Sequence, residues 1–416
     1  MFLGFPIAFA IGITAMFYLF LTNNLANLIV IPQVMFTSLD VFPFLAIPGF
    51  ILAGELMTET KITNILVEFS KKIVGFIPGG LAHVNILASI FFAGISGSSL
   101  ADAAGLGALE IPMMVEGGYT KKFSAAVTAA SSVIGPIIPP SISMVIYALI
   151  AGNVSIGAMF LAGYFPGIVL GIILIIYCYI YAKIKNIAIS EKADIKRIIH
   201  YFKIALIPLG MPMIIMGGIL GGIFTATEAS VVAIFYALIV GFFILKTLKL
   251  SDLPRILRKA GITSSVASIM VAMAKGLAYF LTEQEVIQKI SITIMNYCST
   301  KEIFLLIIIF IFILTGCFFD VASGMIILVP ILLPIAMEFG IHPLHFGIMT
   351  TLGLSISVIT PPVGPALFIC AKLADVSFDI LSREILPFIF MEAIVLFIVV
   401  YWQDFVLFLP RLFGFA

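Results

Sequence analysis

Serine and glycine residues interrupt a long apolar stretch at 80–116, where the sequence reads Ser96-Gly97-Ser98-Ser99. Each half of the stretch has about 15 residues, which is short for a complete bilayer crossing, so we predict a re-entrant hairpin with this break at its tip. At such a tip one half-helix ends and another begins, which leaves free carbonyl and N–H groups side by side. The N–H groups suit a carboxylate, and the carbonyls with serine hydroxyls suit Na⁺. The alternative is that the small residues only allow close helix packing.

A second apolar segment is broken at Gly135-Pro136 and Pro139-Pro140. Proline removes a backbone donor and clashes with the preceding turn, and lipid cannot satisfy the freed carbonyls. The break is therefore expected to lie in protein or beside a wet cavity. Ser141 and Ser143 follow it, where the restarting helix offers N–H groups and hydroxyls. The matching run Thr360-Pro361-Pro362-Val363-Gly364 lacks the serines, so one half is predicted to hold substrate and ion and the other mostly an ion.

Two carboxylates, Asp102 and Asp320, lie within apolar segments. A charge at membrane depth costs at least a few kcal/mol, so it usually faces a cavity or a partner. Asp320 is predicted either to neutralise a cation and accept hydrogen bonds from substrate hydroxyls, or to cap a helix restarting at Val321. Asp102 is expected to be a structural cap or a hydrogen-bond anchor.

The alternative is an intramembrane serine protease, because Gly94-Ile95-Ser96-Gly97 matches the G-x-S-G nucleophile motif of rhomboid intramembrane proteases. That chemistry needs a histidine within hydrogen-bond reach of Ser96. The available histidines are His83, inside the same hairpin, and three others near loop ends. A four-residue match in a chain rich in glycine and serine is weak evidence. We therefore favour a protein that is not an enzyme.

The composition requires an integral membrane protein. Of 416 residues, 62% are hydrophobic and only 10% are charged, against about 25% charged in a typical soluble domain. The hydrophobic segments are continuous rather than alternating, which favours helices over a β-barrel. The net charge of +1 gives no indication of nucleic-acid binding, and the four cysteines are too far apart for a disulfide framework or a zinc site.

The order of the elements follows from hydropathy and charge. An amphipathic segment at 60–76 is expected to lie in the membrane interface, and the basic stretch at 183–203 is expected to be a cytoplasmic loop. About 11 to 14 passes or half-passes fit the length. Full spans are predicted at 3–21, 42–57, 157–182, 204–222 and 229–246.

The second half repeats the order of the first. Three pairs of landmarks recur at nearly constant separation: Pro139 and Pro361 (222 residues), Asn153 and Asp375 (222 residues), and Thr58 and Thr282 (224 residues). The segment 303–338, interrupted at Thr315-Gly316 and from Asp320 to Gly324, is the counterpart of the first hairpin. Equivalent segments differ in basicity, since one interfacial segment is rich in lysine and the other begins with Glu283 and Glu285. We therefore predict an all-α polytopic membrane protein built from inverted repeats, with two re-entrant helical hairpins and two broken helices, which is typical of secondary transporters.

Three ordered runs, with a short one near the start, carry a resemblance to a known family. They are Gly94-Ile95-Ser96-Gly97-Ser98-Ser99-Leu100-Ala101-Asp102-Ala103, Gly135-Pro136-Ile137-Ile138-Pro139-Pro140-Ser141, Ile359-Thr360-Pro361-Pro362-Val363-Gly364 and Phe5-Pro6-Ile7-Ala8-Phe9-Ala10. Over essentially the whole chain the sequence resembles the large membrane subunit of the tripartite ATP-independent periplasmic (TRAP) transporters of the DctM/SiaM type. The resemblance implies import of an organic acid anion by an elevator mechanism, coupled to two or more Na⁺ ions, in the bacterial inner membrane. It also implies two partners, a small four-helix membrane subunit (Q type) and a periplasmic substrate-binding protein (P type).

The resemblance also assigns roles to residues of this chain. Its substrate-binding residues fall on Ser96, Ser141 and Asp320. Its Na⁺ sites, where each hairpin tip meets a Pro-Pro break, fall on Ser96, Ser98, Gly135, Pro139, Gly316, Asp320, Thr360 and Gly364. Among organic acids we favour sialic acid over a C4-dicarboxylate, because a polyol offers hydroxyls to Asp320 whereas a second carboxylate would be repelled.

The same resemblance divides the chain into moving and stationary parts. The expected parts are scaffold helices with a first interfacial arm helix (1–78), hairpin 1 and the first broken helix of the transport domain (79–155), further scaffold helices with a second arm helix (156–302), hairpin 2 and the second broken helix of the transport domain (303–378), and a C-terminal membrane helix (379–416).

Overall fold

A computed structural model describes residues 29–187, 194–297 and 300–415, together with scattered residues between 9 and 20. Within these ranges the chain folds into helices and turns, without a strand. The predicted first span at 3–21 lies largely outside the described residues, as does Cys298. Six of the described helices are long and apolar enough to cross a membrane, or seven if one bent pair is counted as a span. The chain is therefore an all-α polytopic membrane protein.

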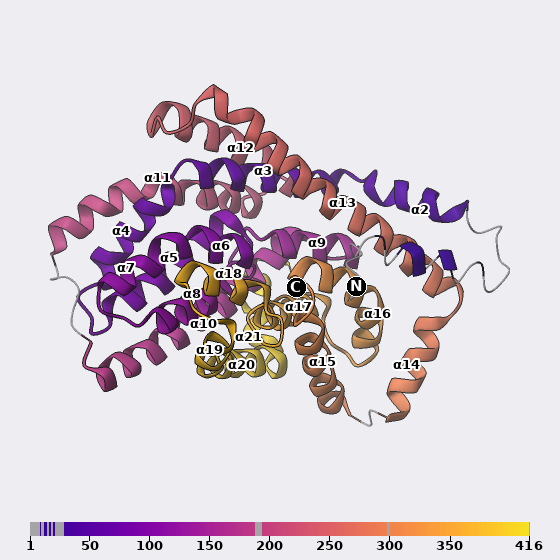
Figure 1. Cartoon of the computed structure of the whole chain (residues 1–416). Helices are drawn as coiled ribbons and strands as arrows, with labels where there is room; N and C mark the ends of the chain where they lie inside the picture. The colour runs from indigo at the N-terminus through magenta and orange to yellow at the C-terminus, as the bar shows by residue number, and fades with distance from the viewer. Residues whose placement is uncertain are drawn as a thin grey trace.

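The helices form two series with the same order of elements (Figure 1). The first series is α3 (Ala46–Glu59), α4 (Ile62–Val74), α5 (Gly80–Ser96), α6 (Ser99–Gly105), α7 (Gly107–Glu116), α8 (Lys121–Ser132), α9 (Ile142–Ala151) and α10 (Ile156–Lys185). The second series is α13 (Leu253–Glu283), α14 (Val286–Tyr297), α15 (Lys301–Gly316), α16 (Val321–Glu338), α17 (Pro343–Ser357), α18 (Pro365–Ala374), α19 (Phe378–Glu384) and α20 (Leu386–Tyr401). Each series thus contains a first helix (α3 or α13), a helix called the arm here (α4 or α14), a hairpin, a broken helix and a final span.

Other helices precede, connect and follow the two series. They are α2 (Val30–Leu39), the 3-10 turn η2 (Phe42–Leu45), α11 (Ile195–Leu220), α12 (Ala226–Ile239), which continues as a π-helical turn η3 (Val240–Ile244), η4 (Leu250–Asp252) and α21 (Gln403–Leu412).

The backbone confirms the repeat at positions where the chain turns. Lys61 and Glu285 precede the arms α4 and α14, and both have positive φ, 58° and 54°. Such a conformation is uncommon for residues other than glycine. Gly118 and Gly340 adopt positive φ at the turn between hairpin and broken helix in each half. The two halves therefore share local geometry, and not only sequence landmarks.

Two predicted boundaries are wrong. In hairpin 2 the predicted helix restart at Val321 is confirmed as the start of α16, and the extension of the break to Gly324 is wrong. The basic stretch at 183–203 is not all loop: α10 continues to Lys185 and α11 begins at Ile195. The Asp194 carboxylate accepts hydrogen bonds from the N–H groups of the first turn of α11, and this cap allows the helix to start among basic residues.

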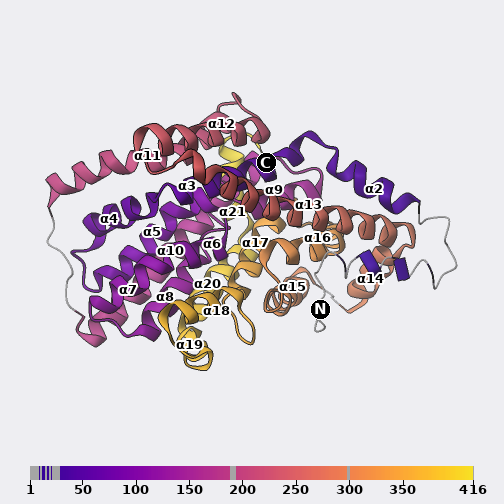
Figure 2. The same cartoon turned by 45° about the horizontal axis from the view of Figure 1, so that its top comes forward.

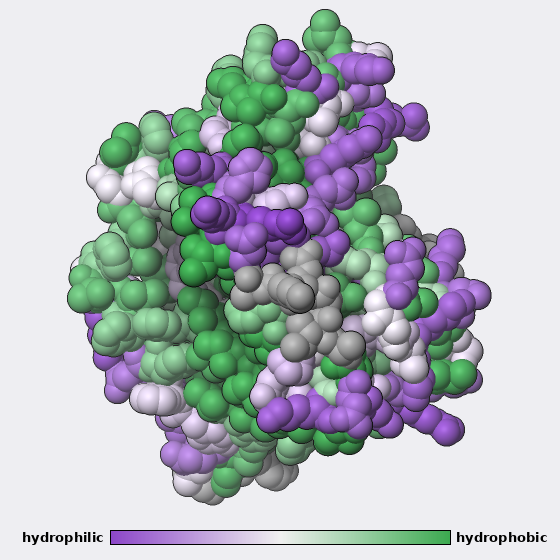
Figure 3. Space-filling view, turned by 90° about the vertical axis from the view of Figure 1, so that its left-hand side faces the viewer, coloured by the Kyte–Doolittle hydropathy of each residue, from purple (hydrophilic) through white to green (hydrophobic). Residues whose placement is uncertain are grey.

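The predicted span at 157–182 is confirmed as α10, and its side chains divide into an exposed set and a buried set at helical spacing. Isoleucines at 168, 172, 176 and 180 are exposed, whereas Leu170, Leu174 and Cys178 are buried. A spacing of four residues keeps each set on one face of a helix. The exposed set suits lipid contact. Apolar and hydrophilic side chains also gather in separate areas of the molecular face shown in Figure 3.

The two repeats are interlocked. Helix α16 of hairpin 2 packs against α9 of the first broken helix, and α18 of the second broken helix packs against α6 and α8. Helix α3 packs against α12 and α13 along one side of the molecule, while the arms α4 and α14 lie at opposite ends (Figures 1 and 2). This arrangement brings both hairpin tips and both breaks to the middle of the molecule.

Candidate functional site

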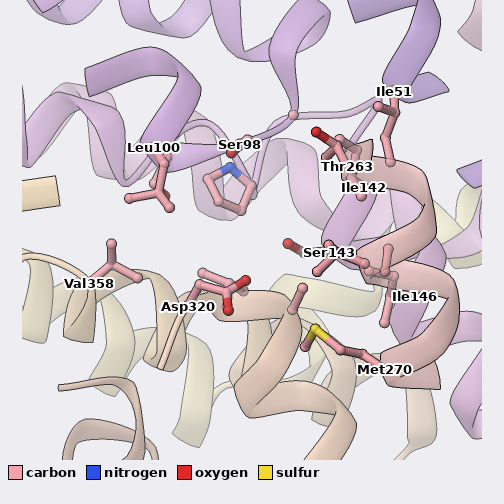
Figure 4. Close-up of a pocket in the computed structure, with 17 residues that line it drawn as sticks. Ile51, Ser98, Leu100, Ile142, Ser143, Ile146, Thr263, Met270, Asp320 and Val358 are labelled. Atoms are coloured by element: carbon pink, nitrogen blue, oxygen red, sulfur yellow. The ribbon is translucent and has the colours of Figure 1, made fainter. Parts of the chain in front are cut away.

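A cavity of about 330 Å³ lies where the first hairpin tip, the first broken helix, α13 and the second hairpin tip meet (Figure 4). Of the described residues that line it, one is charged, Asp320, and the polar ones are hydroxyl-bearing. The lining residues are Ile51, Gly97, Ser98, Ser99, Leu100, Pro136, Ile142, Ser143, Ile146, Thr263, Val266, Ala267, Met270, Asp320, Val321, Ala322 and Val358. Both repeats therefore contribute to one mostly apolar chamber in which Asp320 is the one charged residue among the described lining residues.

The first hairpin tip rests directly on the first break. Gly97 ends α5 with φ 61°, a conformation that favours glycine. A Cβ atom added to Gly97 would lie 2.8 Å from the Pro140 carbonyl oxygen and 3.1 Å from the Ile142 nitrogen. Glycine is thus required at this tip both for the turn and for the close approach to Pro140-Ser141. The two breaks predicted separately in the first half form one structural unit.

Ser96 is turned toward the interior of the tip. Its hydroxyl donates a hydrogen bond to the Asp102 carboxylate and accepts one from the Ser98 N–H at 3.4 Å. Asp102 is 1% exposed, and a Cβ on Gly135 would lie 2.7 Å from its second oxygen. Asp102 is therefore a hydrogen-bond anchor, as predicted, and it holds the tip against Gly135.

Ser141 is also engaged inside the protein. Its hydroxyl donates to the Pro136 carbonyl at 2.6 Å and accepts from the Met144 N–H at 3.3 Å, which caps the first turn of α9. Ser143 lines the cavity instead. The structure thus places Ser96 and Ser141 beside the cavity, while Ser98 and Ser143 face it.

Asp320 lies across the cavity from Ser98 and Leu100, and its carboxylate points into the space (Figure 4). It occupies the N-cap position of α16, but it forms no side-chain bond to the backbone of the first turn. Instead its carboxylate accepts a hydrogen bond from the Ser323 hydroxyl. The predicted cap position before Val321 is therefore confirmed, although the carboxylate makes no cap bond to the backbone, and Asp320 is available to a molecule in the cavity.

The second hairpin tip also meets its own break. A Cβ on Gly316 would lie 2.2 Å from Ser357 Cβ, and the Cys317 thiol donates to the Pro361 carbonyl at 3.6 Å. The Thr360 hydroxyl donates to the Ile356 carbonyl at 2.9 Å. Gly364 begins α18 with φ 52°. The structure brings Gly316 to the second break but directs Asp320 toward the shared cavity.

Sequence reasoning missed the contribution of α13. Thr263 and Met270 line the cavity from this 31-residue helix. No local sequence pattern identifies them as site residues, because only the packing of α13 against the other helices shows which of its side chains face the cavity. Ser99 and Ser143, by contrast, belong to the breaks predicted from the sequence, and both line the cavity.

The geometry argues against the protease alternative. Ser96 donates its hydroxyl proton to a carboxylate rather than to a histidine. His83 is near the opposite end of α5, 13 residues and about 20 Å along the helix from Ser96, with its Nε2 atom 3.1 Å from the Pro78 carbonyl. His345 is bonded to the Val399 carbonyl. In the described part of the chain, no histidine is bonded to Ser96.

Comparisons with known proteins agree with this architecture. Residues 1–405 match the profile of the family described as "Tripartite ATP-independent periplasmic transporter, DctM component". The chain is 38% identical over 413 residues to the sialic acid TRAP transporter large permease protein SiaM of Vibrio cholerae, covering 99% of this chain and 96% of that protein. It is 34% identical over 380 residues to the C4-dicarboxylate TRAP transporter large permease protein DctM of Pseudomonas aeruginosa, covering 91% of this chain and 89% of that protein. The crystal structure of the Alcanivorax borkumensis YdaH transporter has a similar fold, with a TM-score of 0.65 at 13% identity, covering 92% of this chain and 89% of that one.

Proposed function

The chain belongs to the DctM family, the large permease component of TRAP transporters, and on this basis we propose that it imports an organic acid anion together with Na⁺ by an elevator movement. The observation that carries the proposal is the central cavity, into which both hairpin tips project. It offers hydroxyls, the start of a half-helix and one carboxylate.

The anion is bound on the side of the first repeat. Helix α9 begins at Ile142 beside the cavity, and the first N–H groups of a helix together with its dipole favour a carboxylate. Ser98 and Ser143 add hydroxyl donors there. Ser96 and Ser141, the residues assigned by resemblance, reach the substrate only after their bonds to Asp102 and Pro136 open.

Asp320 receives the hydroxyl groups of the substrate from the second repeat. A polyol acid such as sialic acid presents donors to this carboxylate, while a dicarboxylate presents a second negative charge. We therefore favour sialic acid. The relatives leave both chemistries open, since one is named for sialic acid and another for C4-dicarboxylates.

Na⁺ binds where each hairpin tip meets its break. In the first half, the backbone of Ser98 and the Asp102 carboxylate lie against Gly135, and the Ser96 hydroxyl is bonded to that carboxylate. The second oxygen of the buried Asp102 has no hydrogen-bond partner among the described residues. Carbonyl, hydroxyl and carboxylate oxygens are the ligands that a hard cation such as Na⁺ prefers. Pro139 completes the first site. Gly316, Asp320, Thr360 and Gly364 supply the second, so at least two ions accompany each anion.

The moving part comprises residues 79–155 and 303–378, and the remaining spans with the arms form the scaffold. A small four-helix membrane subunit is proposed to pack against the scaffold, and a periplasmic binding protein is proposed to deliver the substrate to the inner membrane.

Uptake of radiolabelled substrate into proteoliposomes with the three purified subunits tests the proposal. We expect sialic acid uptake under an inward Na⁺ gradient, and little effect when a proton gradient is dissipated. Equal uptake with choline in place of Na⁺ would exclude Na⁺ coupling. Succinate uptake without sialic acid uptake would overturn the substrate assignment and leave the transporter assignment intact.

A further inference from the structure

Lys275 forms a contact between two helices that the proposed mechanism assigns to different moving parts. Its ammonium group donates a hydrogen bond to the Ile150 carbonyl at 2.9 Å. Lys275 belongs to α13. Thr263 and Met270, which are nearer the N-terminus of this helix, line the central cavity. Ile150 is in the last turn of α9, one turn beyond Ile146, which also lines the cavity. The contact therefore closes the seam between α9 and α13 beyond one end of the cavity.

The two partners match electrostatically. The last carbonyl groups of a helix have no partner within the helix and carry the negative end of its dipole. Helix α9 ends at Ala151, so Ile150 offers such a carbonyl. An ammonium group within a membrane span is costly unless it is paired. The hydrogen bond thus gives the carbonyl a partner and lowers the free energy of the ammonium group within the membrane. Separating the two groups loses both stabilising effects.

The other described bonds of cations on α13 do not cross this boundary. Arg255 forms a bidentate pair with Glu59 at 2.7 and 2.8 Å, and Lys259 pairs with Glu55 at 2.7 Å. Both glutamates are on α3, which belongs to the same scaffold as α13. These pairs stay together in an elevator movement, whereas Lys275 and Ile150 move apart.

We propose that Lys275 is a conformational latch that holds the transport domain against the scaffold in the arrangement described here. The inference rests on the proposed elevator function, because only a sliding transport domain separates α9 from α13. The barrier to leaving this arrangement then includes the loss of one charge-assisted hydrogen bond and of one helix-terminus interaction.

Replacement of Lys275 tests the latch. Lys275→Met removes the donor and the charge and keeps an unbranched apolar chain, whereas Lys275→Arg keeps both donor and charge. The matched control is Lys259→Met, the same change on the same helix but at a pair within the scaffold. Distances are measured by double electron–electron resonance between spin labels at the exposed Tyr279 on α13 and the exposed Phe368 on α18.

We compare the population of this arrangement with that of the arrangement in which the transport domain has moved along the scaffold. We expect Lys275→Met to lower this population ratio by about ten- to hundredfold, which corresponds to the free energy of a hydrogen bond to a charged group. Lys275→Arg and Lys259→Met should keep the wild-type distribution. A lower melting temperature of Lys275→Met with an unchanged distribution would overturn the latch and make Lys275 a structural helix cap. A single distance in the wild type, unmoved by substrate and Na⁺, would instead refute the elevator function itself.

Discussion

Substitution of Ser96 by alanine distinguishes a substrate ligand from an internal anchor. The Ser96 hydroxyl donates to Asp102, and the other oxygen of Asp102 already has no hydrogen-bond partner among the described residues. In Ser96→Ala the buried carboxylate loses its side-chain donor. No cavity-lining hydroxyl is removed, because Ser96 does not line the central cavity as Ser98 does.

The magnitude follows from the contact that is lost. A hydrogen bond to a charged group contributes about 1.5–3 kcal/mol to stability, and Asp102 is too deeply buried for water to replace the donor. We therefore expect Ser96→Ala to lower the free energy of unfolding by about 2 kcal/mol, measured as a lower melting temperature of the detergent-solubilised protein. When Asp102 is replaced by Asn, the Ser96→Ala change should cost less stability, because a neutral amide loses less free energy than a carboxylate when a hydrogen-bond donor is removed. The double-mutant cycle then gives the interaction free energy between residues 96 and 102.

Ser99 provides the matched control. Its hydroxyl is buried in the same hairpin tip but has no hydrogen-bond partner among the described residues, so Ser99→Ala should leave the melting temperature unchanged or raise it slightly. The reasoning is refuted if Ser96→Ala keeps the wild-type melting temperature while the apparent substrate affinity falls tenfold. Ser96 would then contact substrate directly, as the family resemblance implies.

Further predictions concern the cavity, the ion site and the topology. Ser143→Ala should weaken substrate affinity about tenfold by the loss of a donor to a carboxylate, with an unchanged melting temperature; intact affinity would remove Ser143 from the site. Gly135→Ala should destabilise the protein by about 1–3 kcal/mol and abolish the rise in melting temperature on adding Na⁺, because its Cβ would collide with Asp102; a normal Na⁺ response would contradict the ion site. A cysteine near Lys185 should react with an impermeant reagent from the cytoplasm and one near Glu285 from the periplasm, and labelling of both from one side would contradict the inverted repeat.

Local signals in the sequence were sufficient for most of the architecture. Proline and glycine cannot continue a helix without loss of a hydrogen bond or of order, so the breaks at 133–141 and 358–364 were predictable from composition alone. The continuous apolar segment at 157–182 located α10, and the constant separation of Pro139 and Pro361 indicated the repeat. The breaks and the apolar spans depend on residues that are close in sequence, and the repeat appears when two such local patterns are compared along the chain, which is why one sequence shows both.

Tertiary packing decided which polar groups face the cavity. Ser96 and Ser98 are two residues apart, yet one is bonded to Asp102 and the other faces the cavity, because the tip turns at Gly97 and is pressed against Pro140. Outside regular helices no period predicts the direction of a side chain, so only the neighbouring break determines it. The bond of Lys275 to Ile150 joins residues 125 positions apart, and nothing near either residue in the sequence indicates the other. The sequence determined where the helices break, and the packing of one break on another determined the chemistry that the breaks present.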